Sequence, residues 1–364
     1  MWFERGEKIK NFYTSHERHL SSLALLVGFV VDNFTLQRID LWFENLVLFS
    51  YLGVAGLGIV SVNLYESGRI RGRVVEKLMP LLPLVIQFAF GGLFSGYFIF
   101  YSRSASLAGS WIFIIFLGVL LVGNELFKTR YLRFGFQIAI FYIALFSFTI
   151  FYIPILVGSI GVWVFLLSGL VSIGLMGAFL YFIYKIIPWR VQQGAKQLVV
   201  IIGGAYIAIN AMYFTNVIPP IPLSLKNAGI YHLVERIDNG YVVRQERVEW
   251  YQFYKKYKPT YHRFQNEPVY FFSSVFSPTD LDTKIVHRWA YYNEANKEWV
   301  ESSNISYDIV GGRDGGYRGY SLKENIFPGR WRVDVMTPRG QLLGRYDFVI
   351  EEVFERPILE DVVQ

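Results

Sequence analysis

A glycine-rich segment in the C-terminal part of the chain combines residue types that can bind an acidic or polar ligand. Residues 311–319 read Gly-Gly-Arg-Asp-Gly-Gly-Tyr-Arg-Gly. An arginine guanidinium forms two parallel hydrogen bonds with a carboxylate or phosphate, so this composition suits an acidic group or a sugar. The Gly-x-x-x-x-Gly-Lys-Ser/Thr pattern of nucleotide-binding phosphate loops is absent, and no helix is expected to follow. We therefore expect either a ligand-binding site or an ordinary long loop between strands. The binding candidates are Arg313, Asp314, Tyr317 and Arg318.

Arg288 and Arg332 are candidates for the same role on two predicted strands. In residues 330–336 apolar side chains alternate with charged ones, so Trp331 is expected in the core and Arg332 on the outer face. In residues 284–292, Arg288 lies opposite the face with the bulkier side chains. Both arginines are therefore expected to be available to a ligand.

Catalytic and metal-binding motifs are absent from the sequence. It contains neither Gly-x-Ser-x-Gly nor His-Glu-x-x-His, and it has no cysteine, which excludes thiolate metal sites and a cysteine nucleophile. The histidines lack the spacing of metal ligands, although His232, His262 and His287 could converge in space. We expect no cofactor and no metal. The sequence favours a non-enzymatic protein, although scattered carboxylates could still meet to hydrolyse a glycan.

Polar side chains inside the predicted membrane spans are few. Placing such groups in a bilayer is costly, so they are functional candidates by default. Proton pumps and ion-coupled transporters usually contain buried carboxylates with His or Lys partners, and the spans show no such chain, which disfavours transport. The candidates within the spans are Asp32, Gln87, Gln137 and Asn210.

These residues belong to a chain whose two parts differ in composition. The chain has 364 residues, of which 53% are apolar and 18% charged, and its formal net charge is +6. Residues 1–216 contain 16 Lys and Arg against 9 Asp and Glu, gathered in short clusters. Residues 217–364 contain 19 against 20, interspersed as in a soluble domain. The basic charge therefore belongs to the first part, and it is no evidence for binding to nucleic acid.

The first part contains apolar stretches long enough to span a membrane. A helix needs about 20 apolar residues to cross the hydrocarbon core of a bilayer. Residues 134–184 contain no charged side chain, and Pro154, Gly158 and Gly161 mark the point where this stretch is expected to turn back. The sequence thus predicts an α-helical transmembrane bundle of about seven helices. The predicted spans are 20–37, 41–64, 78–101, 106–123, 134–153, 160–184 and 197–216.

The connections between the predicted spans define an orientation. Four alternate segments, beginning with the N-terminal tail, hold 14 Lys and Arg, whereas the connections between them hold 2. Cytoplasmic loops of membrane proteins carry the excess of Lys and Arg. We therefore expect a multi-pass protein of the plasma (inner) membrane, with the N-terminus in the cytoplasm and the chain after residue 216 outside.

Glycines within the predicted spans would let helix backbones approach closely. Gly92 and Gly96 have the Gly-x-x-x-Gly spacing, and Gly203 and Gly204 are adjacent. We expect these glycines to pack helices inside the bundle. A homo-oligomer that forms through glycine-rich helix faces is the alternative.

The second part of the chain has the sequence features of a β domain. Pro219, Pro220 and Pro222 make a stiff exit from the membrane. Asn239-Gly240 suits the tight turn of a hairpin, and other turn signals separate short segments rich in aromatic and β-branched residues. We therefore predict an extracytoplasmic all-β domain, an antiparallel sandwich of Ig-like or jelly-roll-like type. The predicted strands are 231–237, 241–247, 269–276, 284–292, 303–310, 317–322, 330–336 and 342–351.

The β domain resembles a known family over residues 268–350. The resemblance is carried by Val269-Tyr270-Phe271-Phe272, His287-Arg288-Trp289, Gly329-Arg330-Trp331-Arg332-Val333-Asp334-Val335 and Gly340-Gln341-Leu342-Leu343-Gly344. This stretch is similar to the uncharacterised family called domain of unknown function 2914. The resemblance implies an envelope membrane protein of bacterial type with a small β domain. It brings no agreed activity, so no catalytic residue can be carried over.

Two functions remain open from the sequence. In the preferred one, the bundle anchors a β sandwich that binds an envelope ligand, such as a glycan, a peptide or a partner protein. In the alternative, the bundle is a transporter or an enzyme acting on a lipid-linked envelope substrate, and the β domain is accessory. The predicted segments are a cytoplasmic tail at 1–19, the transmembrane domain at 20–216, a Pro-rich linker at 217–230, the β sandwich at 231–356 and a C-terminal tail at 357–364.

Overall fold

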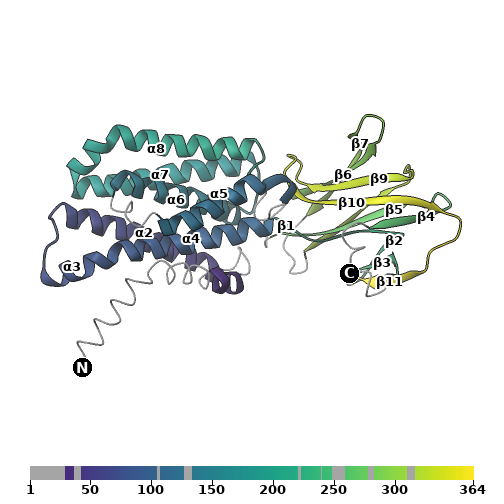
Figure 1. Cartoon of the computed structure of the whole chain (residues 1–364), viewed down its shortest axis with the longest axis horizontal. Coiled ribbons are helices and arrows are strands. Elements are labelled where there is room, and N and C mark those ends of the chain that lie inside the picture. The colour runs from purple at the N-terminus through teal and green to yellow at the C-terminus, as the bar shows by residue number, and fades with distance from the viewer. Residues whose placement is uncertain are drawn as a thin grey trace, which may run out of the picture. The chain divides into compact units, whose positions relative to one another are not determined.

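The chain folds into two compact units, one helical and one rich in β-strands (Figure 1). The helical unit contains most of the chain up to Thr215, and the β unit contains Asn216–Gln364. The computed structural model describes residues 29–36, 42–104, 107–126, 133–219, 223–238, 240–247, 259–277, 283–309 and 316–364.

Seven α-helices form the described part of the helical unit, and residues 29–35 are also helical. The chain turns back at Gly158 and Gly161, as expected, and their φ angles of 67° and 143° are accessible to glycine at little cost. Pro154 is not part of the turn, because α6 continues through this proline. The elements are α2 (Trp42–Glu66), α3 (Arg73–Leu78), the 3-10 helix η1 (Met79–Leu81), α4 (Leu82–Ser104), α5 (Leu107–Leu126), α6 (Phe134–Val157), α7 (Val162–Ile186) and α8 (Pro188–Phe214).

Five of these helices are long and apolar enough to cross a membrane, which supports a membrane protein. The apolar segment found in α5, Ser110–Asn124, is shorter than these five helices. Residues 20–28 and 37 of the first predicted span, 20–37, lie outside the described residues. The total of seven spans therefore stays a prediction. The five helices contain Trp42–Glu66, Leu82–Ser102, Phe134–Val157, Val162–Ile186 and Pro188–Phe214.

Glycines of α4 pack against α2 inside the bundle. A Cβ atom added to Gly92 would lie 2.5 Å from the ring of Tyr51, and one added to Gly96 would lie 2.8 Å from Leu48. Only glycine allows this approach, so the Gly-x-x-x-Gly pair holds two helices of one bundle together, as predicted. Four glycines of α7 and α8 differ, because an added Cβ would meet no described atom within 4 Å. They are Gly174, Gly177, Gly203 and Gly204.

The β unit consists of three sheets. A three-stranded antiparallel sheet has the order β1-β5-β8, a five-stranded sheet the order β4-β10-β9-β6-β7, and a small three-stranded sheet the order β11-β3-β2. All neighbouring strands are antiparallel except β4 and β10, which run parallel. The strands are β1 (Ser224–Tyr231), β2 (Leu233–Ile237), β3 (Gly240–Glu246), β4 (Thr260–Phe264), β5 (Val269–Phe276), β6 (Thr283–Asn293), β7 (Glu298–Ile309), β8 (Tyr317–Lys323), β9 (Gly329–Met336), β10 (Leu342–Val353) and β11 (Leu359–Val363).

Strand β5 has buried side chains on both faces, which explains its continuous apolar sequence. Phe271 belongs to the main core, where it joins Trp289 and Trp331 of the five-stranded sheet. Phe272 belongs to a second cluster with Val243 of the small sheet. Trp331 is fully buried, which confirms its predicted place in the core. Full burial of a side chain such as Phe271 stabilises the fold by about 1.5–3 kcal/mol.

Three strands lie where none was expected. β1 lies in the segment predicted as a linker, β4 in a Tyr- and Lys-rich stretch, and β11 in the segment predicted as a tail. The predicted hairpin of residues 231–247 is confirmed, because β2 and β3 pair with Ile237 opposite Gly240. The parallel pairing of β4 with β10 departs from a purely antiparallel sheet.

Candidate functional site

The four predicted ligand-binding residues that the structure describes do not gather at one place. Arg313 and Asp314 lie outside the described residues. Tyr317 and Arg318 begin β8, where Tyr317 packs against the main core. The backbone carbonyl of Arg318 accepts a hydrogen bond from the Tyr241 hydroxyl at 3.3 Å. The other two candidates belong to the five-stranded sheet, so the described candidates lie on two different sheets.

Arg288 of β6 and Arg332 of β9 lie on the outer face of the five-stranded sheet. Their sequence neighbours Trp289 and Trp331 are buried in the core, so the arginines point away from it. Cross-strand pairing places Arg288 opposite Asp334 and Arg332 opposite Asp347. We name this face the arginine–aromatic surface; it consists of Arg288, Tyr292, Trp299, Arg330, Arg332, Asp334, Arg345 and Asp347.

Asp334 is the buried acid of the arginine–aromatic surface. Its carboxylate accepts hydrogen bonds from Arg345 Nε at 2.6 Å and from Arg288 Nη2 at 2.8 Å. Burial by itself would raise the pKa of Asp334, but the hydrogen bonds and charges of the two arginines outweigh it and lower the pKa. Asp334 therefore stays ionised and fixes the positions of two guanidinium groups.

The other two arginines of this surface, Arg330 and Arg332, stack on aromatic rings. The guanidinium carbon of Arg332 lies 3.9 Å from the centre of the Trp299 ring, and Arg332 Nε donates to Asp347 at 2.6 Å. Arg330 lies over Tyr292 at 4.4 Å and 5.8 Å from Trp299. No carboxylate among the described residues lies within ion-pair distance of Arg330. Arg330 is exposed, so its stacked guanidinium has donors left for a ligand.

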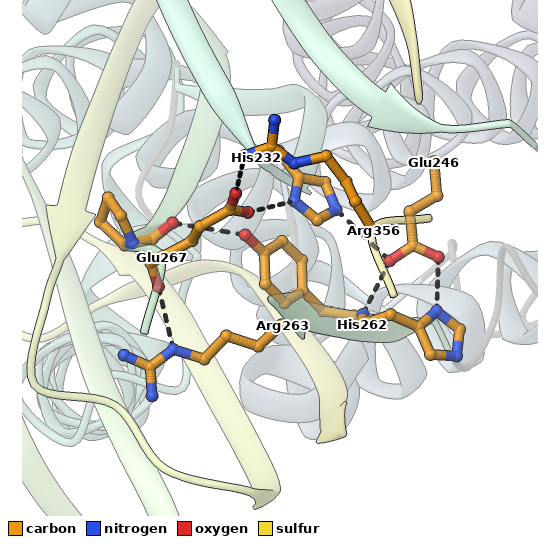
Figure 2. Close-up of polar contacts among 8 residues, drawn as sticks. His232, Glu246, His262, Arg263, Glu267 and Arg356 are labelled. Carbon is orange, nitrogen blue, oxygen red and sulfur yellow. Dashed lines mark hydrogen bonds and ion pairs between the residues drawn. The ribbon is translucent and has the colours of Figure 1, made fainter. Parts of the chain in front are cut away.

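A second polar cluster lies where the small sheet meets β4 (Figure 2). We name it the histidine–glutamate cluster; it consists of His232, Glu246, His262, Glu267 and Arg356. His232 Nε2 lies 3.4 Å from Glu246 Oε1, and Nδ1 lies 3.3 Å from Glu267 Oε2. Glu246 also binds His262 Nδ1 at 2.7 Å, and Arg356 forms an ion pair with Glu267. Two imidazoles therefore share one carboxylate.

The charged form of Glu246 is favoured by its neighbours. Burial raises the pKa of this carboxyl, but hydrogen bonds from His232 and from both the backbone and the side chain of His262 outweigh burial, so the pKa is lowered. The backbone N–H of His262 donates to Glu246 Oε1 at 2.7 Å, which satisfies a donor of the edge strand β4. Glu246 is thus a structural anion.

The third histidine of the predicted group is separate from the other two. His287 is fully buried, between the hydroxyls of Ser273 at 2.8 Å and Ser321 at 2.9 Å. Burial lowers the pKa of His287 to about 3, so its imidazole is neutral. In the described part of the chain, no group of His, Asp or Glu side chains is arranged to hold a metal ion.

The polar candidates of the helical unit are engaged inside the protein. Gln137 and Asn63 are fully buried, and Asn63 Nδ2 donates to Gln137 Oε1 at 2.8 Å. Arg190 Nε in turn donates to Asn63 Oδ1 at 3.0 Å, and Arg190 forms an ion pair with Glu66. Sequence reasoning counted Arg190 only as a topology signal and missed this network.

The other three candidates within the helical unit differ in their surroundings. The Gln87 carbonyl accepts from Asn124 Nδ2 at 2.9 Å, and Asn210 Nδ2 donates to the Tyr206 carbonyl at 2.9 Å. Asp32 lies partly buried in the helical segment 29–35. The structure therefore brings Gln137 into a network with a charged residue, Arg190.

Comparison with known proteins identifies the C-terminal region. Residues 282–350 match the model of a family described as "Protein of unknown function (DUF2914)", in agreement with the resemblance of residues 268–350. The matched residues include the whole arginine–aromatic surface. None of the curated proteins matches the chain.

The similarity to solved structures is weak, as one of the matches illustrates. It is the Pseudomonas fluorescens alkylpurine DNA glycosylase AlkC bound to DNA containing an abasic site analog, at 9% identity and a TM-score of 0.22, covering 86% of this chain and 99% of that one. A TM-score this low carries no argument about fold or function.

Proposed function

We propose that this protein, whose apolar helices precede a β domain matching DUF2914, is a multi-pass protein of the plasma membrane with an extracytoplasmic, sandwich-like β domain. The β domain binds an envelope ligand, a glycan, a peptide or a partner protein, on the arginine–aromatic surface. No cofactor takes part. The coarser statement, a membrane protein with a β domain, rests on the apolar helices and the family match.

Charge at the helix ends supports the proposed orientation. Exposed basic residues gather where α2 and α7 end and α8 begins, and cytoplasmic segments carry such an excess. At the opposite ends of α2 and α7 lie the exposed rings of Trp42 and Trp163, which suit the outer interface of a bilayer. The basic residues are Arg69, Arg71, Arg73, Lys185 and Lys196.

The observation that carries the binding proposal is the state of Arg330. Arg288, Arg332 and Arg345 have carboxylate partners within the sheet, whereas Arg330 is exposed and its contacts with described residues are with aromatic rings. Stacking on Tyr292 pre-orients the guanidinium, so less side-chain entropy is lost when a carboxylate, phosphate or sugar hydroxyl binds it. The strands of a rigid sheet hold this arrangement in place.

The alternative places the function in the helix bundle, as a transporter or as an enzyme on a lipid-linked substrate. The buried Arg190–Asn63–Gln137 network is the observation that favours it, because polar groups in a membrane are functional candidates. These groups satisfy one another, however, and they do not continue as a chain of ionisable residues through the described helices. The β domain is therefore the preferred site.

A binding screen on the full-length protein in nanodiscs tests the proposal. Envelope glycans and peptides are applied to the wild type and to Arg330→Ala. We expect at least one class to bind and the variant to bind about tenfold more weakly, the loss of one charge-assisted hydrogen bond of roughly 1.4 kcal/mol. Arg244→Ala is the control, because Arg244 is an exposed arginine of the small sheet. Absence of binding, together with a substrate-dependent activity of the bundle, would contradict the proposal.

A further inference from the structure

The register of the five-stranded sheet arranges the side chains of its outer face in rows across the strands. Thr260 on β4, Val349 on β10 and Arg330 on β9 form one row. Tyr292 on β6 and Trp299 on β7 continue this row beyond Arg330. Of these five side chains, Arg330 alone is charged. A ligand that lies along the row therefore meets a single cation between neutral side chains.

The arginines of the neighbouring rows are neutralised within the sheet. Arg332 donates to Asp347 at 2.6 Å, and Asp334 accepts from two further arginines at 2.6 Å and 2.8 Å. An anion that approached one of these arginines would compete with a carboxylate already in place. Arg330 has no such competitor among the described residues. An added anion therefore gains most at Arg330.

The aromatic rings beside Arg330 are engaged by cations and by each other. Arg330 lies over Tyr292 at 4.4 Å, and Arg332 lies over Trp299 at 3.9 Å. The two rings meet with 5.3 Å between their centres and 62° between their planes, and both side chains are partly buried. A sugar gains from an aromatic ring when its C–H groups pack on an open, electron-rich ring face. This arrangement therefore disfavours a neutral glycan as ligand.

The surroundings of the Arg330 guanidinium match an acidic peptide better than an acidic sugar. Val349 lies beside Arg330 on one neighbouring strand and Tyr292 on the other, so apolar surface flanks the cation. A sugar ring carries hydroxyl groups around its rim, and each one that loses water without finding a partner costs free energy. An acidic side chain between apolar ones has the same distribution as the row, with one charge and apolar neighbours.

Acidic residues around the row limit the negative charge that the site accepts. Asp347 and Glu301 lie in the neighbouring row, on either side of Arg332 and Ala290. Glu351 lies further along β10, where it is 3.9 Å from a histidine of β4. One free cation compensates one negative charge, and nearby carboxylates repel a second. A carboxylate fits this balance, whereas a phosphate dianion does not.

We propose that the ligand of the arginine–aromatic surface is an acidic peptide and that Arg330 binds one of its carboxylates through two parallel hydrogen bonds. This assignment rests on the proposed function, because it concerns the same surface. Tyr292 is a positioning residue. Its ring holds the guanidinium in one orientation, so less side-chain entropy is lost when the carboxylate binds.

Binding of two matched peptides to the full-length protein in nanodiscs tests the proposal. The peptides are acetyl-Thr-Val-Glu-Val-Thr-amide and its counterpart with Gln in place of Glu, and saturation-transfer NMR measures their dissociation constants. We expect the wild type to bind the Glu peptide about tenfold more tightly, or about 1.4 kcal/mol. Arg330→Gln should bind both peptides equally, and Arg244→Ala in the small sheet should keep the preference. Equal affinities in the wild type, or a preference that survives in Arg330→Gln, would overturn the proposal.

Two variants of Tyr292 test its positioning role. Tyr292→Leu removes the ring beneath the guanidinium, and we expect the preference for the Glu peptide to fall to about threefold. Tyr292→Phe keeps the ring and should keep the tenfold preference. A general loss of stability would weaken the binding of both peptides alike and leave their ratio unchanged. A full preference in Tyr292→Leu would overturn the positioning role.

Two further probes separate a peptide carboxylate from other anions. Glucuronate carries a carboxylate on a sugar ring, and inorganic phosphate carries more than one negative charge near pH 7.5. Both should bind about tenfold more weakly than the Glu peptide. Asp347→Asn removes one acid and frees Arg332, so it should raise the affinity for phosphate about tenfold. Glucuronate binding as tight as that of the Glu peptide would overturn the assignment in favour of an acidic glycan.

These outcomes also separate the ligand assignment from the proposed function. If an envelope ligand binds and depends on Arg330, but the wild type does not prefer the Glu peptide to the Gln peptide, the assignment of an acidic peptide fails and the proposed function stands. If no envelope ligand and no probe depends on Arg330, both fail.

Discussion

At the scale of single residues, His287 shows how burial controls protonation in the β domain. Its ring contacts two serine hydroxyls, and the Ser273 hydroxyl also lies 2.8 Å from that of Tyr307. Ser273 and Ser321 belong to the sheet β1-β5-β8, whereas His287 and Tyr307 belong to the five-stranded sheet. Hydroxyls accept and donate without charge, so this network holds the two sheets together with a neutral imidazole.

We predict that His287 makes the β domain sensitive to acid. Between about pH 6.5 and pH 3 the unfolded chain binds a proton at this position and the folded chain does not, because burial lowers the pKa of His287 to about 3. The free energy of unfolding should therefore fall by up to about 1.4 kcal/mol per pH unit through this range. Chemical denaturation at several pH values, followed by tryptophan fluorescence, measures this free energy. In His287→Gln it should fall less steeply as the pH is lowered. Equal slopes in both proteins would contradict the prediction, and between pH 7.5 and 8.5 neither should show this contribution.

The sequence predicted residues of the arginine–aromatic surface but not those of the histidine–glutamate cluster. Alternation within one strand was enough to place Arg288 and Arg332 on an outer face. Arg330 was placed on the same face but was not singled out, because its partners Tyr292 and Trp299 come from other strands. The histidine–glutamate cluster gave no local signal, since it forms only when β3 and β4 are brought together.

At the scale of elements, glycine packing fixes the distance between α2 and α4. We predict that Gly92→Leu destabilises the bundle by about 1–3 kcal/mol, because the new side chain would overlap the ring of Tyr51. Gly174→Leu in α7 is the matched control, since no described atom lies within 4 Å of an added Cβ there. Thermal unfolding in detergent measures both. An equal loss of stability in Gly174→Leu would indicate that this face of α7 is itself in contact with another helix. The predicted homo-oligomer would provide such a contact, and it stays a prediction.

The elements that the sequence did not predict share a physical cause. β1, β4 and β11 are held mainly by partners far along the chain, β5, β10 and β3. Their own sequences lack alternation, and β1 follows a proline-rich segment that favoured a linker. Strands in which apolar and polar residues alternate, such as β9, were predicted correctly, because the alternation reflects the two faces of one strand. Pairing between distant strands leaves no such local pattern.

At the scale of the whole molecule, the uneven distribution of charge between the two parts indicates a membrane topology. In the described helices the basic residues lie near the ends where α2 and α7 finish, and Arg103 of α4 is the exception, at the opposite end. The β domain, with nearly balanced charge, follows α8, which runs away from the basic end. If the basic end is cytoplasmic, the β domain lies outside whether or not the first apolar segment spans the membrane.

The absence of cysteine makes this topology directly measurable. Gly72→Cys places a single thiol between α2 and α3, and Asn293→Cys places one at the end of β6, so the unmodified chain gives no background. A thiol reagent that cannot cross the membrane should label intact cells at 293 and label 72 only after permeabilisation. Labelling at 72 in intact cells, or protection of both thiols, would overturn the orientation and remove the envelope ligand from the reach of the arginine–aromatic surface. Equal labelling of both variants in detergent is the control that each thiol is accessible.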